Sequence, residues 1–377
     1  MFNIVFIGFG RRSDTLWRHA FMPTGECRIA AIADPMWETI KAKGLEYLAD
    51  CHYYATAEEM LEKEKPDGIV IGTGCDLHTK YALLVAKYGL PLFLEKPVSI
   101  NEEQRAELET ILPTMNDKTV VSFPLRITEV VQKTKELLDS GIIGEIAQVQ
   151  AINNVPYGRC YFHGWYRDDN RTGGLFLQKA THDLDYLTYL IGQGEPRYIC
   201  AVESKMVFKG DKPAGMSCKD CPEADTCPES LLNMPKDDPQ KYGNYCCFAK
   251  DTGNHDSATV IMQYENGLHA VYTQNFIVRK TAGKRGARFV GFKGTLEFDF
   301  NTPQITFTDH FSDEIKIFRF PKLQAHGGGD ALLGQKFVDA MKGIAIDTPN
   351  LADGISSVKL CLAAKKSAED HTFTEIR

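Results

Sequence analysis

The sequence predicts an α/β protein in which a doubly wound parallel sheet precedes an α+β region with a large, mostly antiparallel sheet. Short apolar segments alternate with amphipathic ones through the first 123 residues, which indicates strands and helices in turn. After residue 144, strand-like segments follow one another, which favours antiparallel pairing. The length of 377 residues exceeds one ordinary core. We therefore expect two domains, 1–123 and 124–377, the second with a cysteine-rich insertion at 209–250.

The composition excludes several classes of protein. Apolar residues make up 43% and charged residues 25% of the chain, as in folded soluble proteins. A net charge of -7 without a long basic stretch argues against a nucleic-acid partner. No apolar run approaches the roughly 20 residues that cross a bilayer, and the amino terminus lacks the cationic start of a signal peptide. We therefore expect a cytoplasmic protein without membrane partners, whose eleven cysteines are reduced, metal-bound or packed as small apolar groups.

The first predicted element is a buried strand at 3–8, a short apolar run that ends in glycine. The loop after it contains Gly8, Phe9, Gly10, Arg11, Arg12 and Ser13. A dinucleotide fold needs a tight turn here and a close backbone approach to pyrophosphate at a helix start, and Gly8 and Gly10 fit these two roles. Ser13 occupies the place of the usual third glycine, so the fingerprint is incomplete. An ordinary glycine turn is the alternative.

The second predicted strand, 27–33, ends at Asp34. A carboxylate at this strand end accepts hydrogen bonds from the ribose hydroxyls of adenosine and repels a 2′-phosphate. Asp34 therefore favours NAD over NADP, although Arg11 and Arg12 could still attract a phosphate. The alternative is an aspartate that caps a helix or a turn.

The alternation continues with strands at 68–72, 90–94 and 119–122 and with helices at 56–63, 78–88 and 102–112. Thr56 and Glu59 have the spacing of a capping box. Ligands of parallel sheets bind at the carboxyl ends of the strands. The residues that fall at such ends are Gly8, Asp34, Thr73, Glu95 and Lys96.

Lys96 is the candidate acid–base group. It follows a buried strand and precedes Pro97, which fixes the local backbone. A lysine there would point into the cofactor crevice, where partial burial beside a positive nicotinamide favours the neutral amine. Such an amine takes a proton from a hydroxyl as hydride leaves, or returns one to a carbonyl. From the tripeptide Glu95-Lys96-Pro97 alone, a solvated loop lysine is the alternative.

Together these motifs resemble the Gfo/Idh/MocA family, which includes glucose–fructose oxidoreductase and inositol dehydrogenases. The resemblance rests on Ile7-Gly8-Phe9-Gly10, Asp34, the segment from Thr73 to His78, Glu95-Lys96-Pro97, Arg126, the turn at 140–144, and Gly173-Gly174 leading to His182. It implies an amino-terminal Rossmann domain, a last helix that packs back on that domain, and homodimers or homotetramers. We accordingly assign cofactor binding to Gly8, Phe9, Gly10, Arg11, Asp34, Thr73, His78, Glu95 and Lys96.

In the second half, strands are predicted at 149–154, 198–208, 257–264, 269–276, 287–292, 294–300 and 304–308. The Asn-Gly pair within 264–268 is a hairpin signal. Helices are predicted at 129–138, 175–190, 332–341 and 354–369.

His182 lies in the predicted helix at 175–190. The resemblance implies that it sits beside Lys96 and contacts the reacting hydroxyl, where an imidazole relays the proton and orients the alcohol. A lone helical histidine is more often structural, but the preceding Gly-Gly and the His-Asp-Leu-Asp context favour the functional interpretation. Asp185, one turn from His182, either orients its ring or is a structural carboxylate.

Gln178 marks a departure from the family, whose polyol dehydrogenases often carry an aspartate four residues before the histidine. Glutamine hydrogen-bonds a sugar hydroxyl but cannot accept a proton or stabilise imidazolium by charge. In a regular helix Gln178 shares a face with His182, and Lys179 turns away from it. The departure argues against simple inositol dehydrogenation. Lys179 is either a substrate residue or a solvated lysine.

Further candidates for contacting the substrate are Arg126, His163, Trp165 and Arg167. Arg126 enters through the resemblance. For the other three, an aromatic ring stacks on the C–H face of a sugar, and arginine binds hydroxyls or a carboxylate. The alternative is a surface loop with an ordinary packed tryptophan.

The cysteines of the insertion at 209–250 suggest a metal site. Cys218 and Cys221 have the C-x-x-C spacing that grips one metal ion, and two more thiolates complete a tetrahedron. The preferred set is Cys218, Cys221, Cys227 and Cys247, and zinc is the preferred ion. An iron–sulfur cluster, free thiols and a facultative disulfide are the alternatives. A structural role is expected, because the loop is too polar to bury itself.

The sequence thus predicts an NAD-dependent oxidoreductase that acts on a sugar, polyol or glycoside, with Lys96 as acid–base group and His182 as relay. Redox-neutral glycoside cleavage through a transient keto-sugar is a second hypothesis, because some relatives use it and the usual aspartate is absent. A non-catalytic NAD-binding sensor is the third hypothesis. The joint presence of Lys96 and His182 argues against the sensor.

Overall fold

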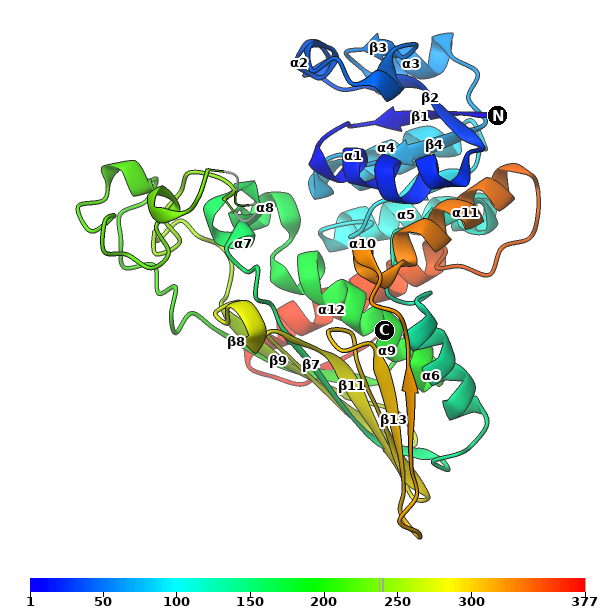
Figure 1. The fold of residues 1–377 in the computed structure, drawn as a ribbon, viewed down its shortest axis with the longest axis vertical. Coiled ribbons are helices and arrows are strands. Elements are labelled where there is room, and N and C mark those ends of the chain that lie inside the picture. The colour runs from blue at the N-terminus through cyan, green and yellow to red at the C-terminus, as the bar shows by residue number, and fades with distance from the viewer. Residues whose placement is uncertain (237, 239–240, 377) are drawn as a thin grey trace. The chain divides into compact units, whose positions relative to one another are not determined.

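The computed structural model describes residues 1–236, 238 and 241–376 (Figure 1). They form two compact units, which we call the first and the second unit. The first unit contains residues 1–132, 184–186 and 322–359, and the second contains 133–183, 187–321 and 360–377. The predicted boundary at 123 thus falls shortly before the end of the first stretch of the first unit. A late segment of the chain also belongs to the first unit.

A six-stranded parallel sheet forms the centre of the first unit, with the strand order β3-β2-β1-β4-β5-β6. Its strands are β1 (Phe2–Ile7), β2 (Cys27–Ala33), β3 (His52–Tyr54), β4 (Gly68–Ile71), β5 (Leu92–Leu94) and β6 (Thr119–Val121). Five of the six were predicted. The sequence analysis missed β3, because its residues His-Tyr-Tyr are not a buried apolar run, whereas the equally short β5 and β6 are buried and mostly apolar. The strand order reverses between β1 and β4, which is where such sheets bind ligands.

Helices cover this sheet and complete its core. They are α1 (Arg11–Leu16), α2 (Trp37–Ala42), α3 (Ala57–Lys63), α4 (His78–Ala86), α5 (Glu102–Met115), α10 (Gln324–Gly327) and α11 (Gly329–Met341). The predicted cap of α3 is present, since Thr56 Oγ1 accepts a hydrogen bond from Glu59 N–H. Phe337 of α11 packs edge-on against Phe21 and Phe93. This late helix therefore supplies part of the core of the first unit.

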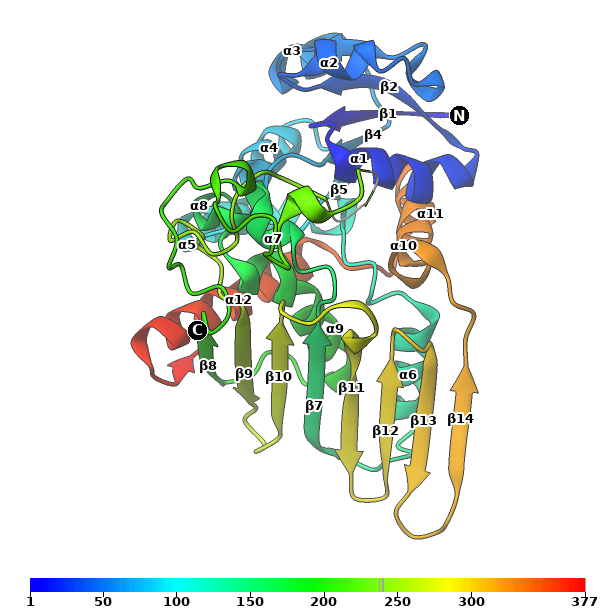
Figure 2. The same cartoon turned by 60° about the vertical axis from the view of Figure 1, so that its left-hand side comes forward.

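The second unit contains a nine-stranded sheet with the order β14-β13-β12-β11-β7-β10-β9-β8-β15 (Figure 2). Its strands are β7 (Ile146–Asn154), β8 (Tyr198–Ser204), β9 (Ser257–Gln263), β10 (His269–Asn275), β11 (Lys284–Gly291), β12 (Gly294–Asp299), β13 (Gln304–Asp309), β14 (Ile315–Arg319) and β15 (Thr374–Glu375). All neighbours pair antiparallel except β7 and β10. The mostly antiparallel sheet is thus confirmed, and β14 and β15 are additions to the prediction.

Five helices accompany the second sheet, three of them with residues in both units. They are α6 (Glu129–Asp139), α7 (Cys160–His163), α8 (Asp169–Thr172), α9 (Thr181–Ile191) and α12 (Leu351–Asp370). The Asn-Gly hairpin is confirmed between β9 and β10, where Tyr264 N–H donates to Leu268 O at 2.8 Å. Gly267 in this turn has a φ of +90°, which favours glycine.

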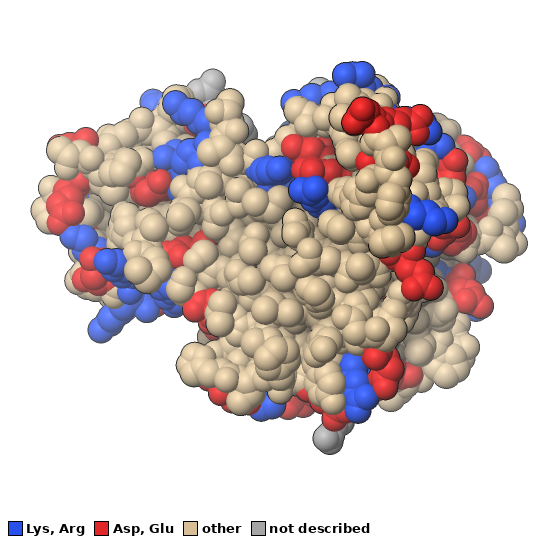
Figure 3. Space-filling view, turned by 90° about the horizontal axis from the view of Figure 1, so that it is seen from below, with Lys and Arg blue, Asp and Glu red and all other residues tan. Residues whose placement is uncertain are grey.

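Two structural findings concern helix length and surface charge. Among the described residues, no helix is both long and apolar enough to cross a membrane. On the face drawn in Figure 3, acidic and basic side chains are intermixed around a broad uncharged area, and its described residues form no continuous cationic stripe.

Candidate active site

The glycine loop lies between the carboxyl ends of β1 and β4, at the reversal of strand order. Gly8 has a φ of +82°, and a Cβ atom placed on it would come within 2.7 Å of Thr73 Cγ2. Glycine alone suits both this conformation and this close approach. A Cβ atom on Gly10 would meet nothing within 4 Å. The space in front of α1 is therefore open to a pyrophosphate group.

Ser13 replaces the third glycine of the dinucleotide fingerprint without loss of packing. Its buried hydroxyl donates a hydrogen bond to Gly8 O at 2.8 Å and lies 3.4 Å from Gly72 O. The serine thereby joins α1 to the ends of both β1 and β4. The incomplete fingerprint in the sequence is thus compatible with a closely packed loop.

Asp34 connects the end of β2 to the glycine loop. Its Oδ2 accepts a hydrogen bond from Phe9 N–H at 2.8 Å, and its Oδ1 accepts one from Met36 N–H at 2.8 Å. Each carboxylate oxygen keeps a second lone pair that a ribose hydroxyl can use. The Phe9 ring is turned into the core against Phe6. Any contact of Phe9 with a cofactor would therefore come from its backbone.

His78, predicted as a cofactor residue, is buried among protein carbonyl groups. Its Nδ1 lies 2.7 Å from Pro97 O, and its Nε2 lies 3.3 Å from Thr73 O. Burial lowers the pKa of this imidazole, so we assign the single proton of the neutral ring to the shorter contact. The resulting hydrogen bond holds the backbone beside Lys96. His78 is thus a positioning residue for this loop.

Glu95 belongs to a buried ion network that sequence reasoning missed. Arg12 Nε lies 2.7 Å from Glu95 Oε1, and Arg12 Nη2 lies 2.7 Å from Asp330 Oδ1. Ser122 Oγ donates to the same Glu95 oxygen at 2.8 Å. Asp330 lies in α11, 318 positions along the chain from Arg12 in α1, so no local pattern indicated the pair. The network fixes the residue that immediately precedes Lys96.

Asp330 gives this network a pH dependence. Burial opposes its charge, but Arg12 and the His326 ring, whose Nδ1 lies 2.8 Å away, together lower the pKa of the carboxyl. A depressed folded-state pKa stabilises the fold above the ordinary pKa, and this contribution is lost as the pH falls toward the folded-state value. We expect Asp330→Asn to destabilise the protein at neutral pH, with a deficit that shrinks below about pH 4. Urea unfolding at several pH values measures this, and a constant deficit would contradict it.

Lys96 begins the loop after β5 and is joined to Pro97 by a cis peptide bond. Its side chain is partly buried and lies near enough to affect the pKa of both Cys75 and His78. Arg11 is exposed at the first position of α1. Residues of the first unit that lie at or just beyond strand ends are Gly8, Gly10, Asp34, Thr73, Glu95 and Lys96. Their binding of a cofactor stays a prediction.

In the second unit, a π-helical turn at Phe176–Ala180 precedes α9. Its hydrogen bond runs from Thr181 N–H to Phe176 O, so the turn holds one residue more than an α-helical turn. The prediction that Gln178 and His182 share a face assumed a regular helix, and that spacing does not hold across this turn. Both side chains are buried. Turns of this kind are frequent at functional sites.

Lys179, in the same turn, is buried, which excludes the solvated-lysine alternative. Its Nζ donates a hydrogen bond to Tyr157 Oη and lies 4.7 Å from the centroid of the Tyr157 ring. The Tyr157 side chain is exposed. Sequence reasoning missed Tyr157, since only the fold brings it to Lys179. Lys179 therefore binds the hydroxyl group of a tyrosine that is itself exposed.

Asp183 is a second residue that the sequence analysis missed. Arg285 of β11 binds it with two hydrogen bonds of 2.8 Å each, and Asn153 Nδ2 and Tyr272 Oη donate to its Oδ2 at 2.8 and 3.0 Å. The carboxylate is fully buried, and its charge is matched by the guanidinium. It fastens the start of α9 to three strands and so fixes the backbone beside His182.

The Asp185 carboxylate is held by Arg126, as the structural alternative predicts, while its orientation of the His182 ring stays a prediction. Arg126 binds its carboxylate with two hydrogen bonds, through Nε at 3.0 Å and through Nη2. The third nitrogen, Nη1, lies 2.9 Å from Asp353 Oδ2. The Arg126 guanidinium, predicted to contact the substrate, is thus engaged by two carboxylates within the first unit.

His163 and Arg167, also predicted to contact the substrate, are buried. His163 is bound to the insertion at 209–250, and Arg167 is bound to the residues just after it. His163 Nδ1 lies 2.6 Å from Tyr245 O. Arg167 Nη2 donates to Asp251 and Thr252. Trp165 is partly exposed and stacks on the adjacent Tyr166, with a centroid distance of 4.2 Å. Of these three predictions, Trp165 is the residue with surface left for a ligand.

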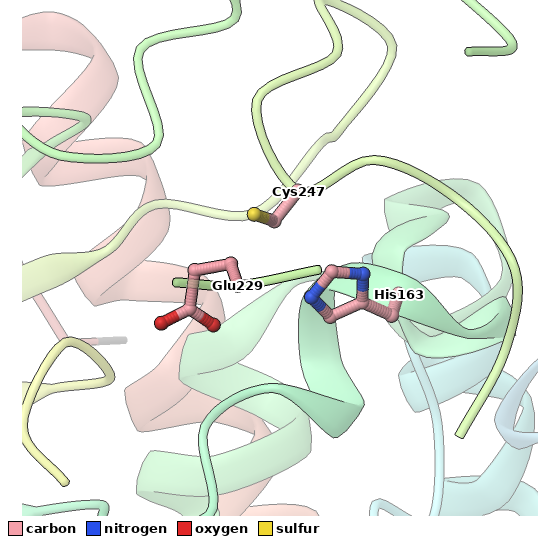
Figure 4. Close-up of side chains that lie close together, drawn as sticks. All are labelled: His163, Glu229 and Cys247. Carbon is pink, nitrogen blue, oxygen red and sulfur yellow. The ribbon is translucent and has the colours of Figure 1, made fainter. Parts of the chain in front are cut away.

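The predicted cysteine ligands are not brought together at ligand spacing. Among the described residues, one group of three or more potential ligand atoms lies within 4.8 Å of one another, formed by His163, Glu229 and Cys247 (Figure 4). The other predicted ligands, Cys218, Cys221 and Cys227, are outside this group. The four-cysteine site therefore stays a prediction, and the group that the structure brings together shares Cys247 with it.

The strand order of the first unit, the glycine loop at its reversal point and the carboxylate of Asp34 define a dinucleotide-binding domain of the Rossmann type. Residues 2–123 match the profile of an oxidoreductase family with an NAD-binding Rossmann fold. Residues 131–297 match the profile of the GFO/IDH/MocA C-terminal domain. The chain belongs to the Gfo/Idh/MocA family of oxidoreductases.

Individual relatives are similar at low identity. The chain is 24% identical to the putative oxidoreductase YteT of Bacillus subtilis, over 88% of this chain and 87% of that protein. It is 26% identical to inositol 2-dehydrogenase of Rhizobium meliloti, over 50% of this chain and 55% of that protein. A levoglucosan dehydrogenase in complex with NADH and levoglucosan gives a TM-score of 0.76 at 16% identity, covering 100% of this chain and 99% of that one. This structural likeness shows the fold.

Proposed function

We propose that the protein transfers a hydride between NAD and a ring hydroxyl or ketone of a sugar, polyol or glycoside. The proposal rests on Lys96, which follows β5 in the same unit as the glycine loop and Asp34. Bound NAD would accept or supply the hydride. The backbone at Gly8 and Gly10 suits the pyrophosphate, and Asp34 suits the adenosine ribose.

In this proposal Lys96 takes the proton of the substrate hydroxyl when hydride leaves, and returns it in the reverse direction. His182 orients the hydroxyl and relays the proton. Lys96 belongs to the first unit and His182 to the second, so their action on one substrate stays a prediction. The substrate-binding candidates that keep this assignment are Gln178, Lys179 and Trp165. The substrate class is supported by relatives named as inositol and levoglucosan dehydrogenases.

A panel of inositols, aldoses, anhydrosugars and glycosides, each incubated with NAD and the full-length protein, tests the proposal. Sustained formation of NADH with one member supports net dehydrogenation. Cleavage of a glycoside without net NADH supports the redox-neutral alternative, which the absence of the usual aspartate at position 178 keeps open. Binding of NAD without turnover of any panel member would favour the sensor.

Asp34 should set the preference for NAD. We expect Asp34→Ala to weaken NADH binding about tenfold, because it removes a ribose acceptor and the partner of Phe9 N–H, at about 1.4 kcal/mol per tenfold. NADPH binding should weaken less or improve, because the charge that repels a 2′-phosphate is lost. Fluorescence titration with both cofactors measures this. Glu38→Gln, which removes an exposed charge from α2, is the control. Equal losses for both cofactors would contradict the assignment.

We further propose a cytoplasmic homodimer or homotetramer that takes a small carbohydrate as its partner. Size-exclusion chromatography with light scattering gives the mass in solution. A monomer at micromolar concentration would contradict this part of the proposal.

A further inference from the structure

The insertion at 209–250 meets α7 at His163. Asn244 N–H and Tyr245 N–H both donate to His163 O, at 3.0 and 3.1 Å. The imidazole lies 2.6 Å from Tyr245 O through its Nδ1. The backbone carbonyl and the imidazole of His163 thus both anchor the insertion to α7.

The second ring nitrogen of His163 is the feature that this anchoring leaves unexplained. Nδ1 faces a carbonyl, so it carries the proton and Nε2 presents a lone pair. That Nε2 atom is buried, the whole side chain is 1% exposed, and Nε2 has no hydrogen-bond partner. A buried acceptor without a partner costs free energy. Histidine ligands of metals characteristically donate the other ring N–H to a carbonyl in this way.

Two further ligand types surround this lone pair. Cys247 Sγ, a Glu229 carboxylate oxygen and a His163 ring nitrogen all lie within 4.8 Å of one another (Figure 4). Glu229 and Cys247 come from different parts of the insertion, and His163 comes from α7. A single ion between them would join three segments of the chain.

The charges around Glu229 restrict the kind of ion. Arg159 Nε lies 2.9 Å from its Oε2, and Arg279 Nη2 lies 2.9 Å from its Oε1. These guanidiniums fix the carboxylate, and each oxygen keeps one further lone pair. They also disfavour a hard cation that binds through carboxylates alone. An ion that gains most of its binding from imidazole nitrogen and thiolate sulfur tolerates them, and zinc is the common one.

A cysteine binds Zn²⁺ as a thiolate, so the proton of Cys247 leaves to solvent as the sulfur–metal bond forms. His163 Nε2 and one oxygen of Glu229 supply two further ligands. A neighbouring thiol or a water then completes a tetrahedron.

We propose that His163 Nε2, Cys247 Sγ and the Glu229 carboxylate bind one Zn²⁺ ion that fastens the insertion to α7. The site is structural, because its ligands are buried or half-buried and its role is to close a loop that has little apolar surface of its own. It differs from a four-cysteine site in requiring a histidine and in not requiring Cys221.

The test measures zinc in the full-length protein purified without chelators and then dialysed. We expect about one zinc per chain. His163→Gln and Cys247→Ser should each weaken Zn²⁺ binding at least about tenfold. Even the loss of a residue that only holds a ligand in place typically weakens metal binding by about that factor. Cys221→Ser is the matched control and should keep its zinc. Retention by both ligand variants, or absence of zinc from wild type even after Zn²⁺ is added, would overturn the proposal.

X-ray absorption of the zinc-loaded wild type covers the case in which a variant fails to fold. We expect mixed ligands around zinc, with Zn–N or Zn–O distances of about 2.0 Å and Zn–S distances of about 2.3 Å. A shell of sulfur alone would overturn the proposal in favour of a four-cysteine site. Loss of zinc in Cys221→Ser, with retention in His163→Gln, would do the same.

Discussion

Replacing Lys96 by methionine should abolish nearly all turnover while the protein still binds NADH. The substitution keeps the length of the side chain but removes the only group in the first unit that we assign to proton transfer. General acid–base groups contribute on the order of 10²–10⁴-fold to rate, so we expect a loss of that size in kcat. The measurement is kcat with the substrate identified in the carbohydrate panel, together with NADH titration.

Lys96→Arg separates proton transfer from charge. Arginine keeps a cation at the end of β5 but cannot give up its proton in a protein. If Lys96 acts as acid–base group, Lys96→Arg should lose about as much activity as Lys96→Met. Lys43→Met, in an exposed position, is the matched control and should be as active as wild type. Substantial activity in Lys96→Arg would show that Lys96 acts through its charge alone.

The first unit could be predicted well from sequence, because its signals are local. Each of its predicted strands is a short, mostly apolar run, and the residues proposed for cofactor binding and proton transfer lie at or just beyond the strand ends. The tight turn at Gly8 and the position of Asp34 follow from the same pattern, since both lie directly after a predicted strand. The strand β3 was missed, because its polar and aromatic residues lie partly exposed and form no apolar run.

The candidate site in the second unit was harder to predict from sequence, because it depends on contacts between distant segments. The π turn at Phe176–Ala180 changes the spacing around Gln178, and no composition signal marks it. Tyr157 reaches Lys179, and Arg285 reaches Asp183 across 102 positions. The sequence shows that a residue is charged, but it does not show which residue will bind that charge in the folded core.

Two predicted substrate contacts show the same limit. Arg167 was chosen because arginine binds hydroxyls and carboxylates, whereas Arg126 was chosen through the family resemblance. In the fold their guanidiniums bind carboxylates of the protein itself, Asp185 and Asp251. The residue type was informative about the chemistry, while the partner had to come from the structure.

The largest effect on stability is expected from Arg12→Met. The Arg12 side chain is 26% exposed, but its partners Glu95 and Asp330 are 6% and 1% exposed. The substitution would leave two buried carboxylates without their cation. Breaking a buried ion pair on one side typically costs about 3–5 kcal/mol, and we expect a loss of that size in the free energy of unfolding. Chemical denaturation followed by tryptophan fluorescence measures it, with Arg18→Met, a surface ion-pair residue, as the control.

Removing the two carboxylates that lose their cation shows whether the loss of stability comes from their uncompensated charge or from lost packing. The triple variant Arg12→Met, Glu95→Gln, Asp330→Asn has no buried carboxylate left in the network. It should therefore be more stable than Arg12→Met alone, because removing all charged partners of a buried pair costs far less than removing one. If the triple variant is no more stable than Arg12→Met, the guanidinium contributes through packing instead. In that case the network would not hold Glu95, and the loop that begins at Lys96 would need another explanation for its position.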